Sequence, residues 1–338
     1  MTENQNLYPL SFNPFLKYAI WGGRNLEDFG RFLPEEGTAE SWEIAAHKNG
    51  SSVVTNGIHT GKDLVELTAE LGEALVGSYG KWALERKKFP LLVKLLDANR
   101  NLSVQVHPKD PYALEHEGNE LGKTEMWVIL AAKPGSKLIY GVKEGTTPEK
   151  FRKGIEDGNL EEYLHEVPAT VGAHLCVPAG SLHAICEGIV LAEIQQNSDT
   201  TYRVYDWNRL GKDGKPRQLH VDKALDVIDF EQVERDFVEP KLVSEENGIK
   251  TTILCQNEYF ITERIFMDAD VEYTGNCDGA TLEIWGILEG SATLNDMELS
   301  PIQFILLPAQ MGEYTLIAKE GCILLRATLP EPDEKVCC

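Results

Sequence analysis

Short apolar runs that end at Gly, Pro or Asn recur along the chain and predict a mainly β protein. They are rich in Val, Ile and Leu, as strands are. In chain order they read SSVVTNG, PLLVKLLDA, LSVQVH, EMWVILAA, KLIYGV, HLCVPAG, GIVLAEIQQ and TYRVYDW. This spacing favours an antiparallel sandwich or barrel.

Three segments have helical periodicity instead. Residues 63–77 place leucines three or four positions apart, and Asp63 with Glu66 can form a capping box at the start. Residues 146–158 read TTPEKFRKGIEDG, with a Thr-Pro start and a closing Gly that are typical of helix ends. Residues 220–228 predict the third helix.

The acidic segment 229–248 lacks an apolar period and predicts a connector between two domains. We expect a catalytic domain with helical insertions over residues 1–235, a C-terminal domain over 236–330 and a flexible tail over 331–338. Beyond the connector, runs such as YFITERIFM and LEIWGILEGSATL again predict strands.

A weak internal repeat links the two predicted domains. HLCVPAGSLHAI before the connector and FILLPAQMGEYTL after it share an apolar run, Pro-Ala and a return strand. The second copy lacks the His, and all eight histidines lie at or before His220. We therefore expect the C-terminal domain to hold no metal.

The formal net charge of -22 repels phosphate backbones and anionic lipid, so we expect neither nucleic acid nor a membrane as partner. No window approaches the roughly 18 apolar residues of a membrane span. The start, MTENQNLYPLSF, lacks the basic and apolar regions of a signal peptide. We expect a cytoplasmic protein in which an anionic substrate would need a local cluster of Lys and Arg.

The stretch LSVQVHPKD places an amide and an imidazole inside an apolar run. Gln105 and His107 are two positions apart and project from the same face of a strand, with valines on the other face. An unsatisfied buried polar group costs about 1–3 kcal/mol, so either hydrogen bonds or a metal ion must satisfy both residues. For this pair alone, ordinary hydrogen bonding is the simpler interpretation.

Two further segments add candidate metal ligands. Glu125 stands at the entry of the apolar strand in GKTEMWVILAA. The segment GAHLCVPAGSLHAI fits the pattern G(x)5PxG(x)2H, in which Gly180 permits a tight turn and His183 heads the return strand.

This spacing resembles the second motif of the cupin superfamily, whose small β-barrels hold a metal among His and Glu side chains. The first cupin motif usually begins His-x-His, whereas Gln105-Val106-His107 resembles the zinc site of the type I mannose-6-phosphate isomerases. The matching stretches are FPLLVKLLDA, LSVQVHP, GKTEMW, VPAGSLHAI and EIQQNSDTTYRVYDW, with WGG at 21–23 and ESWEIAAH at 40–47. The resemblance covers nearly the whole chain.

The resemblance implies a bicupin of two double-stranded β-helix (jelly-roll) units and an aldose-ketose isomerase. Such an enzyme interconverts mannose 6-phosphate and fructose 6-phosphate through a cis-enediol(ate). It also implies one zinc ion per chain, held by Gln105, His107, Glu125 and His183. An open site with two imidazoles is a catalytic rather than a structural zinc arrangement, although iron or manganese could substitute.

Three residues are candidates for the reaction itself. Lys123 is two residues before Glu125, so in an extended segment both share a face; it is either the base or a surface lysine. Arg203 follows Glu193 by ten residues, the spacing at which the family places a catalytic arginine after an acidic residue. We expect Arg203 to stabilise the enediolate. Glu193 either contacts Arg203 and sugar hydroxyls or faces solvent from an edge strand.

For the phosphate we expect Ser103, which shares the face of the Gln-Val-His motif, together with Lys94. The alternative for Lys94 is an ion pair with Asp97 or Glu125. Trp21 is a candidate for the wall of the sugar pocket, or else a core residue.

Two other functions remain open from the sequence. One is a non-enzymatic cupin that binds sugar phosphates, which would be indicated by loss of Lys123 or Arg203; both are present. The other is a metal-dependent cupin oxygenase, against which the Gln ligand and the Lys and Arg residues argue. The oligomeric state is left open.

Overall fold

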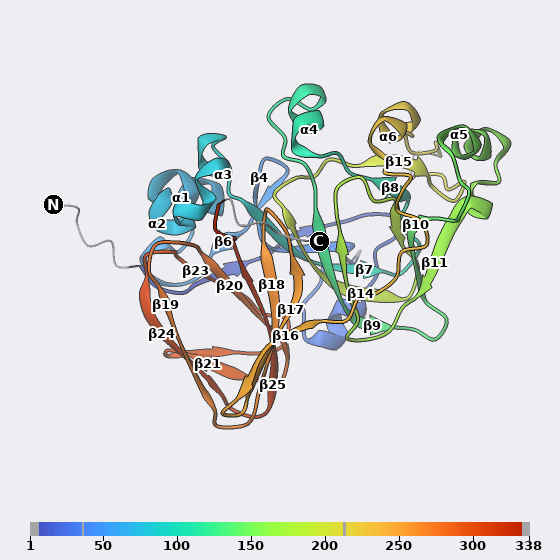
Figure 1. The fold of residues 1–338 in the computed structure, drawn as a ribbon. Helices are drawn as coiled ribbons and strands as arrows, with labels where there is room; N and C mark the ends of the chain where they lie inside the picture. The colour runs from blue at the N-terminus through green and yellow to red at the C-terminus, as the bar shows by residue number, and fades with distance from the viewer. Residues whose placement is uncertain (1–6, 36, 212–213, 333–338) are drawn as a thin grey trace. The chain divides into compact units, whose positions relative to one another are not determined.

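The computed structural model describes residues 7–35, 37–211 and 214–332 (Figure 1). The protein is mainly β, as predicted, with sheets of eight, six, five, four and two strands. The chain forms two compact units. Unit 1 contains the described parts of Met1–Phe15, Trp42–Lys94 and Glu239–Cys338, and unit 2 contains Leu16–Ser41 and Leu95–Val238.

This division differs from the continuous domains that the sequence predicts. The chain enters the C-terminal part of unit 1 after Val238, near the predicted boundary, but N-terminal segments belong to the same unit. The reason is long-range strand pairing: β1 (Leu10–Asn13) pairs with β23 (Phe304–Leu307) and with β6 (Val53–Val54). Such pairing leaves no local signal in the sequence. The predicted tail lies outside the described residues from residue 333 onward.

Unit 1 is built on an eight-stranded sheet with the order β16-β17-β18-β25-β20-β23-β1-β6 and a four-stranded sheet with the order β19-β24-β21-β22. Side chains from both sheets form its apolar core. The further strands are β16 (Lys241–Glu246), β17 (Ile249–Gln256), β18 (Ile261–Met267), β25 (Cys322–Thr328), β20 (Glu283–Glu289), β19 (Glu272–Cys277), β24 (Gly312–Ala318), β21 (Ala292–Leu294) and β22 (Met297–Leu299), with the separate pair β4 (Ala46–His47) and β5 (Gly50–Ser51). The predicted connector thus includes an edge strand, β16, whose side chains are largely exposed.

The first predicted helix is confirmed at its start and divided at its end. Helix α1 (Leu64–Leu71) begins with the expected capping box, since Asp63 and Glu66 each bond the other's backbone N–H. The chain then turns at Gly72, which has a φ of 50°, and continues as α2 (Glu73–Val76) and α3 (Lys81–Glu85). A positive φ suits glycine, and this break was not predicted.

Unit 2 contains a five-stranded sheet with the order β11-β10-β13-β8-β15. Its second sheet contains β12, β9 and β14 and continues into β7, β3 and β2, three strands in which the chain passes from one unit to the other. Both sheets contribute to one apolar cluster, so they form two packed layers. The strands are β11 (Leu164–Pro168), β10 (Lys137–Val142), β13 (His183–Ile185), β8 (Val104–Val106), β15 (Tyr202–Tyr205), β12 (His174–Val177), β9 (Glu125–Ala132), β14 (Ile189–Gln196), β7 (Leu91–Ala98), β3 (Glu40–Ile44) and β2 (Phe15–Lys17).

Three helices pack against the five-stranded sheet of unit 2, because Tyr112, Phe151 and Ala224, one from each helix, join an apolar cluster with side chains of its strands (Figure 1). Helices α5 (Pro148–Asp157) and α6 (Val221–Val227) confirm the sequence prediction, while α4 (Asp110–His116) was not predicted. Four short 3-10 helices complete the described elements: η1 (Asn25–Phe29), η2 (Gly57–His59), η3 (Ser78–Gly80) and η4 (Leu160–Tyr163). Within the described residues, no helix has both the length and the apolar character needed to span a bilayer.

The internal repeat extends to strand register. In unit 2, Glu125 begins β9 and pairs with Val177, the residue before the Pro-Ala turn. In unit 1, Glu283 begins β20 and pairs with Leu307, which precedes the second Pro-Ala turn. Strand β14 flanks β9 on its other side, as β25 flanks β20. The two glutamates therefore occupy equivalent positions in their units.

The carboxylate of Glu283 is satisfied by neighbouring side chains of unit 1. Its Oε2 accepts hydrogen bonds from Tyr314 Oη at 2.7 Å and from Trp285 Nε1 at 3.0 Å. Arg326 Nη1 lies 3.8 Å from the same oxygen, and Arg326 Nε donates to Glu263 Oε2 at 2.8 Å. Burial acts to lower the pKa of Arg326, but the two carboxylates raise it above its ordinary value. A guanidinium thus supplies the positive charge in this buried cluster.

Replacing Arg326 is therefore expected to destabilise unit 1. Arg326→Met leaves two carboxylates inside the protein without their counter-charge, and breaking a buried pair costs about 3–5 kcal/mol. Urea denaturation of the variant and the parent protein measures the loss in the free energy of unfolding.

Lys250→Met is the matched control, because Lys250 pairs with Glu245 in the same unit through side chains that are 43% and 60% exposed. An exposed pair contributes about 0–1 kcal/mol. Equal losses in both variants would contradict the proposed role of the buried pair.

Candidate metal centre

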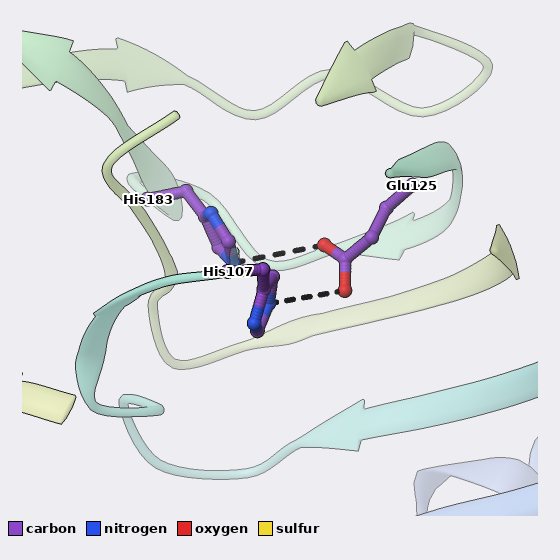
Figure 2. Close-up of side chains that lie close together, drawn as sticks. All are labelled: His107, Glu125 and His183. Atoms are coloured by element: carbon purple, nitrogen blue, oxygen red, sulfur yellow. Dashed lines mark ion pairs between the residues drawn. The ribbon is translucent and has the colours of Figure 1, made fainter. Parts of the chain in front are cut away.

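Side chains that are far apart in the sequence meet between the sheets of unit 2. Strand β8 lies between β13 and β15, and Gln105 pairs directly with His183 on one side and with Arg203 on the other. Directly paired residues of antiparallel strands project from the same face, so these three side chains form a row. Figure 2 shows His107 and His183 facing the carboxylate of Glu125, which comes from β9.

Each of the four predicted ligands lies within 3.6 Å of at least one of the others. Glu125 Oε1 is 3.2 Å from His107 Nε2, and Glu125 Oε2 is 3.6 Å from His183 Nε2. The amide Nε2 of Gln105 lies 3.3 Å from His183 Nε2. His107, Glu125 and His183 are each only 1% exposed, and their candidate ligand atoms all lie within 4.8 Å of one another.

Backbone carbonyls orient both imidazoles. His107 Nδ1 lies 2.8 Å from Thr200 O, and His183 Nδ1 lies 3.0 Å from Ser181 O. A carbonyl can only accept a hydrogen bond, so each Nδ1 donates and each Nε2 keeps its lone pair for the centre. Histidines that ligate metals usually have this outer hydrogen bond.

The local sequence explains why these side chains point inward. Val104 and Val106 are fully buried in an apolar cluster on the other face of β8, as the alternation predicts. Gly180 has a φ of 94°, which confirms the tight turn predicted before His183. Its N–H donates to His107 O at 2.9 Å, so the turn also ties the two histidine segments together.

The electrostatics fit a bound cation. Burial, followed by the charge of Lys123, lowers the pKa of His107 to about 3, so its imidazole is neutral, as a metal ligand must be. Burial would raise the pKa of Glu125, but the charge of Lys123 lowers it well below its ordinary value. Among the described residues, neither buried oxygen of Glu125 accepts a hydrogen bond of suitable geometry. This His, Glu and His group could therefore hold a metal ion.

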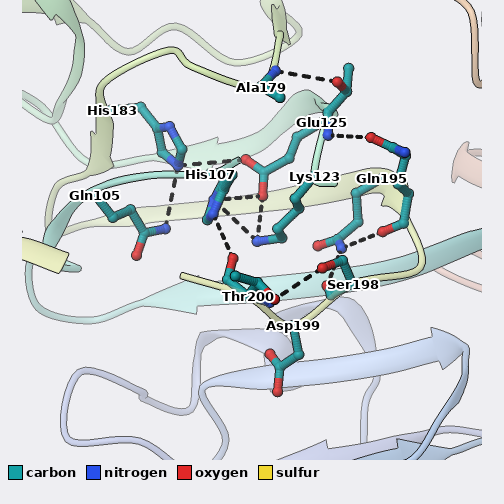
Figure 3. Close-up of polar contacts among 12 residues, drawn as sticks. Gln105, His107, Lys123, Glu125, Ala179, His183, Gln195, Ser198, Asp199 and Thr200 are labelled. Carbon is teal, nitrogen blue, oxygen red and sulfur yellow. Dashed lines mark hydrogen bonds and ion pairs between the residues drawn. The ribbon is translucent and has the colours of Figure 1, made fainter. Parts of the chain in front are cut away.

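Lys123 lies directly beside the candidate centre (Figure 3). Its Nζ is 2.5 Å from Glu125 Oε1 and 3.3 Å from His107 Nε2. The residue is 4% exposed, so the alternative interpretation as a surface lysine is wrong.

Arg203 reaches the same group through Ser103. Arg203 Nε donates to Ser103 Oγ at 3.1 Å, and Ser103 Oγ donates to Gln105 Oε1 at 3.4 Å. Burial, and next the charge of Arg217, lower the pKa of Arg203. Ser103 therefore contacts the Gln-Val-His motif from the predicted face, and it links Arg203 to that motif.

Two arginines that the sequence did not single out lie close to Arg203 in the chain and share one carboxylate. Arg209 Nη2 and Arg217 Nη2 each lie 2.5 Å from Asp206 Oδ1. The pKa of Asp206, which burial would raise, is lowered by these two guanidinium groups. The available signal was the recurrence of Arg in the polar segment after TTYRVYDW.

The polar run after β14 sets the position of the carbonyl that orients His107. Gln195 Nε2 donates to the carbonyl oxygens of Gln196 and Ser198, both at 2.7 Å (Figure 3). Asp199 pairs with Lys17 at 3.2 Å, and Thr200 O then faces His107. Backbone groups of this kind cannot be identified from a side-chain pattern.

The roles assigned to Glu193, Lys94 and Trp21 from the sequence stay predictions, although the structure shows where each residue lies. Glu193 is 2% exposed within β14, opposite Trp127, so it does not face solvent. Lys94 is buried in β7, in the part of that strand that belongs to unit 1. Trp21 is 5% exposed in the apolar cluster between the sheets of unit 2, which favours the core alternative.

Comparison with known proteins agrees with this geometry. Residues 10–139 match the family described as phosphomannose isomerase type I, catalytic domain. Mannose-6-phosphate isomerase ManA of Bacillus subtilis is 39% identical over 94% of this chain and 98% of its own length. Mannose-6-phosphate isomerase of Streptococcus mutans is 43% identical over 75% of this chain and 77% of its own length.

A solved structure gives the same result. The crystal structure of the mannose 6-phosphate isomerase from Bacillus subtilis superposes with a TM-score of 0.84 at 37% identity, and covers 94% of this chain and 99% of that one. These similarities agree with the strand framework and with the buried His, Glu and His group. The chain therefore belongs to the type I phosphomannose isomerase family.

Proposed function

We propose that this protein interconverts mannose 6-phosphate and fructose 6-phosphate at a zinc centre held by Gln105, His107, Glu125 and His183. The observation that carries this proposal is the convergence of buried His107, Glu125 and His183 with half-buried Gln105 and with Lys123, in a chain of this family. Two imidazole nitrogens favour zinc over calcium or magnesium, which prefer oxygen ligands. A bound divalent ion would polarise the sugar oxygens at C1 and C2 and stabilise their negative charge.

Lys123 is the proposed base. Its Nζ is held by Glu125 beside the ligands, and in the neutral amine form it could take a proton from one sugar carbon and return it to the neighbouring carbon. The buried position excludes water, which limits loss of the proton to solvent. Glu193, buried two residues before Gln195 on the same strand face, is proposed to bind a sugar hydroxyl.

Arg203 is proposed to stabilise the enediolate oxygens. A guanidinium stays charged at every working pH and binds paired oxygens in a fork. Ser103 fixes one edge of that guanidinium at Nε. Arg209 and Arg217, which share Asp206, are proposed as the phosphate dock together with Ser103. Their positive charges would attract a phosphate locally, although the protein as a whole has a formal net charge of -22.

We also infer that each unit is a cupin-type jelly roll. Support comes from the matched register of β9 and β20 and from the Pro-Ala turn that follows each paired strand. Glu283 then takes the place of Glu125 in a unit where Tyr314, Trp285 and Arg326 satisfy it.

Removing the metal is expected to abolish turnover. Dialysis of the purified protein against EDTA, followed by a mannose 6-phosphate isomerisation assay, should give no activity, and added zinc should restore it. Elemental analysis should find about one zinc ion per chain, since the described residues contain one such group. Full activity of metal-stripped protein would exclude the zinc mechanism.

Two arginine variants separate catalysis from phosphate binding. Arg203→Ala is expected to lower kcat by about 10²- to 10³-fold, the usual cost of losing one oxyanion partner. Arg209→Ala is expected chiefly to raise KM for mannose 6-phosphate, because it removes a charge from the proposed dock. Steady-state kinetics measures both effects.

Arg152→Ala serves as the control, since Arg152 forms an ion pair with Asp222 in unit 2 through side chains that are 45% and 87% exposed. We expect its kinetics to match those of the parent protein. A normal kcat in Arg203→Ala would remove this residue from the mechanism.

The base role of Lys123 is tested with two replacements. Lys123→Met removes the proton acceptor, and Lys123→Arg keeps the charge in a group that does not deprotonate in proteins. If Lys123 is the base, both variants should lose about 10²- to 10⁴-fold in kcat, the usual contribution of general base catalysis.

Exchange of the C2 proton of mannose 6-phosphate with deuterium oxide should fall in parallel in both variants. High activity in Lys123→Arg would show that only the charge is needed and would reassign the base.

A further inference from the structure

Thr124 lies between Lys123 and Glu125, and three of its atoms form hydrogen bonds with two other segments of unit 2. Its Oγ1 accepts a hydrogen bond from Ala179 N at 3.2 Å, in the turn that precedes His183. Its N–H donates to Gln196 Oε1 at 3.0 Å, and its carbonyl accepts from Gln196 N at 3.1 Å. Thr124 therefore fixes the backbone from which the base and the carboxylate project.

Gln196 extends these contacts to the segment that follows His107. The side chain is fully buried, and its Nε2 donates to Asp110 Oδ1 at 3.2 Å. The same Oδ1 accepts from Gly122 N at 2.5 Å. One glutamine side chain thus joins the Asp110 turn to Thr124.

Three segments that contribute to the candidate centre are linked by this network. They are residues 107–110 with His107, residues 122–125 with Glu125, and residues 179–183 with His183. Backbone bonds run in parallel, since Lys123 N donates to Pro108 O at 3.0 Å. Neither Thr124 nor Gln196 is one of the four proposed ligands.

We infer that Thr124 and Gln196 are positioning residues that set the spacing between His107, Glu125 and His183 for the metal ion. This inference rests on the proposed function only in its use of a metal centre. Metal affinity depends steeply on ligand placement, and losing an outer hydrogen bond typically costs about 10- to 100-fold. Thr124 has the more direct effect because it is adjacent to the ligand itself.

The test uses an isosteric pair of variants in the full-length protein. Thr124→Val keeps the volume but removes the acceptor for Ala179 N, and is expected to raise the Kd for Zn²⁺ about 10- to 100-fold in a chelator competition assay. Thr124→Ser keeps the oxygen and should restore the parent Kd to within a few-fold. The visible spectrum of the Co²⁺-loaded protein should change in Thr124→Val and not in Thr124→Ser.

Thr262→Val is the matched control for a purely structural effect. Thr262 is a fully buried threonine of unit 1 whose Oγ1 donates to Cys255 O at 3.3 Å. This variant should lower Tm by an amount comparable to Thr124→Val but leave the Kd for Zn²⁺ and the Co²⁺ spectrum unchanged. If Thr124→Val also leaves both readouts unchanged, the inference is overturned.

Gln196→Met gives a second route if Thr124→Val does not fold. It removes the bonds to both Thr124 N and Asp110, and it should weaken Zn²⁺ binding in the same way. A parent-like Kd in Gln196→Met would contradict the inference.

The results distinguish failure of the proposed function from failure of the positioning role. If the parent protein binds Zn²⁺ but does not isomerise mannose 6-phosphate, the proposed function is wrong while the positioning role can still be scored from Kd. If the parent protein isomerises the sugar and Thr124→Val binds Zn²⁺ normally, the positioning role alone is wrong.

Discussion

The structure of unit 2 depends on keeping a charged carboxylate inside the protein. Glu125 is 1% exposed, and transferring such an ion from water into a protein interior costs several kcal/mol, by order of magnitude, unless opposite charge and ligands offset it. Lys123 offsets this cost at one oxygen, and a cation held between Glu125 and the Nε2 atoms of His107 and His183 would offset it further. The same arrangement places the proposed base, Lys123, beside one carboxylate and two imidazoles, the combination that the proposed aldose-ketose chemistry at a metal requires.

Both units place a glutamate at the start of the equivalent strand, and they satisfy it differently. In unit 1, Glu283 is bonded by Tyr314 and Trp285 and lies near Arg326, so a fixed guanidinium provides the positive charge. In unit 2, the imidazoles of His107 and His183 face Glu125 instead, and their Nε2 atoms suit a removable ion. A single framework position thus gives a structural ion pair in one unit and a candidate catalytic centre in the other.

Local patterns in the sequence predicted much of this site. Alternation placed Gln105 and His107 on one face of β8, and Gly180 marked the turn before His183; both interpretations are confirmed. What the sequence did not predict depends on long-range contacts: the pairing of β1 with β23, and the carbonyls that orient the histidines. Arg209 and Arg217 were missed because their shared partner, Asp206, gives them a role only in the folded chain.

The proposed chemistry depends on one ion being held by His107, which follows β8, together with Glu125 of β9 and His183 of β13. Diffraction from crystals of the zinc-loaded protein, recorded above and below the zinc absorption edge, tests this most directly. We predict one anomalous peak in contact with the Nε2 atoms of His107 and His183 and with Glu125, at about 2.0–2.2 Å from each ligand atom. A peak elsewhere in the protein, with these three side chains unliganded, would contradict it.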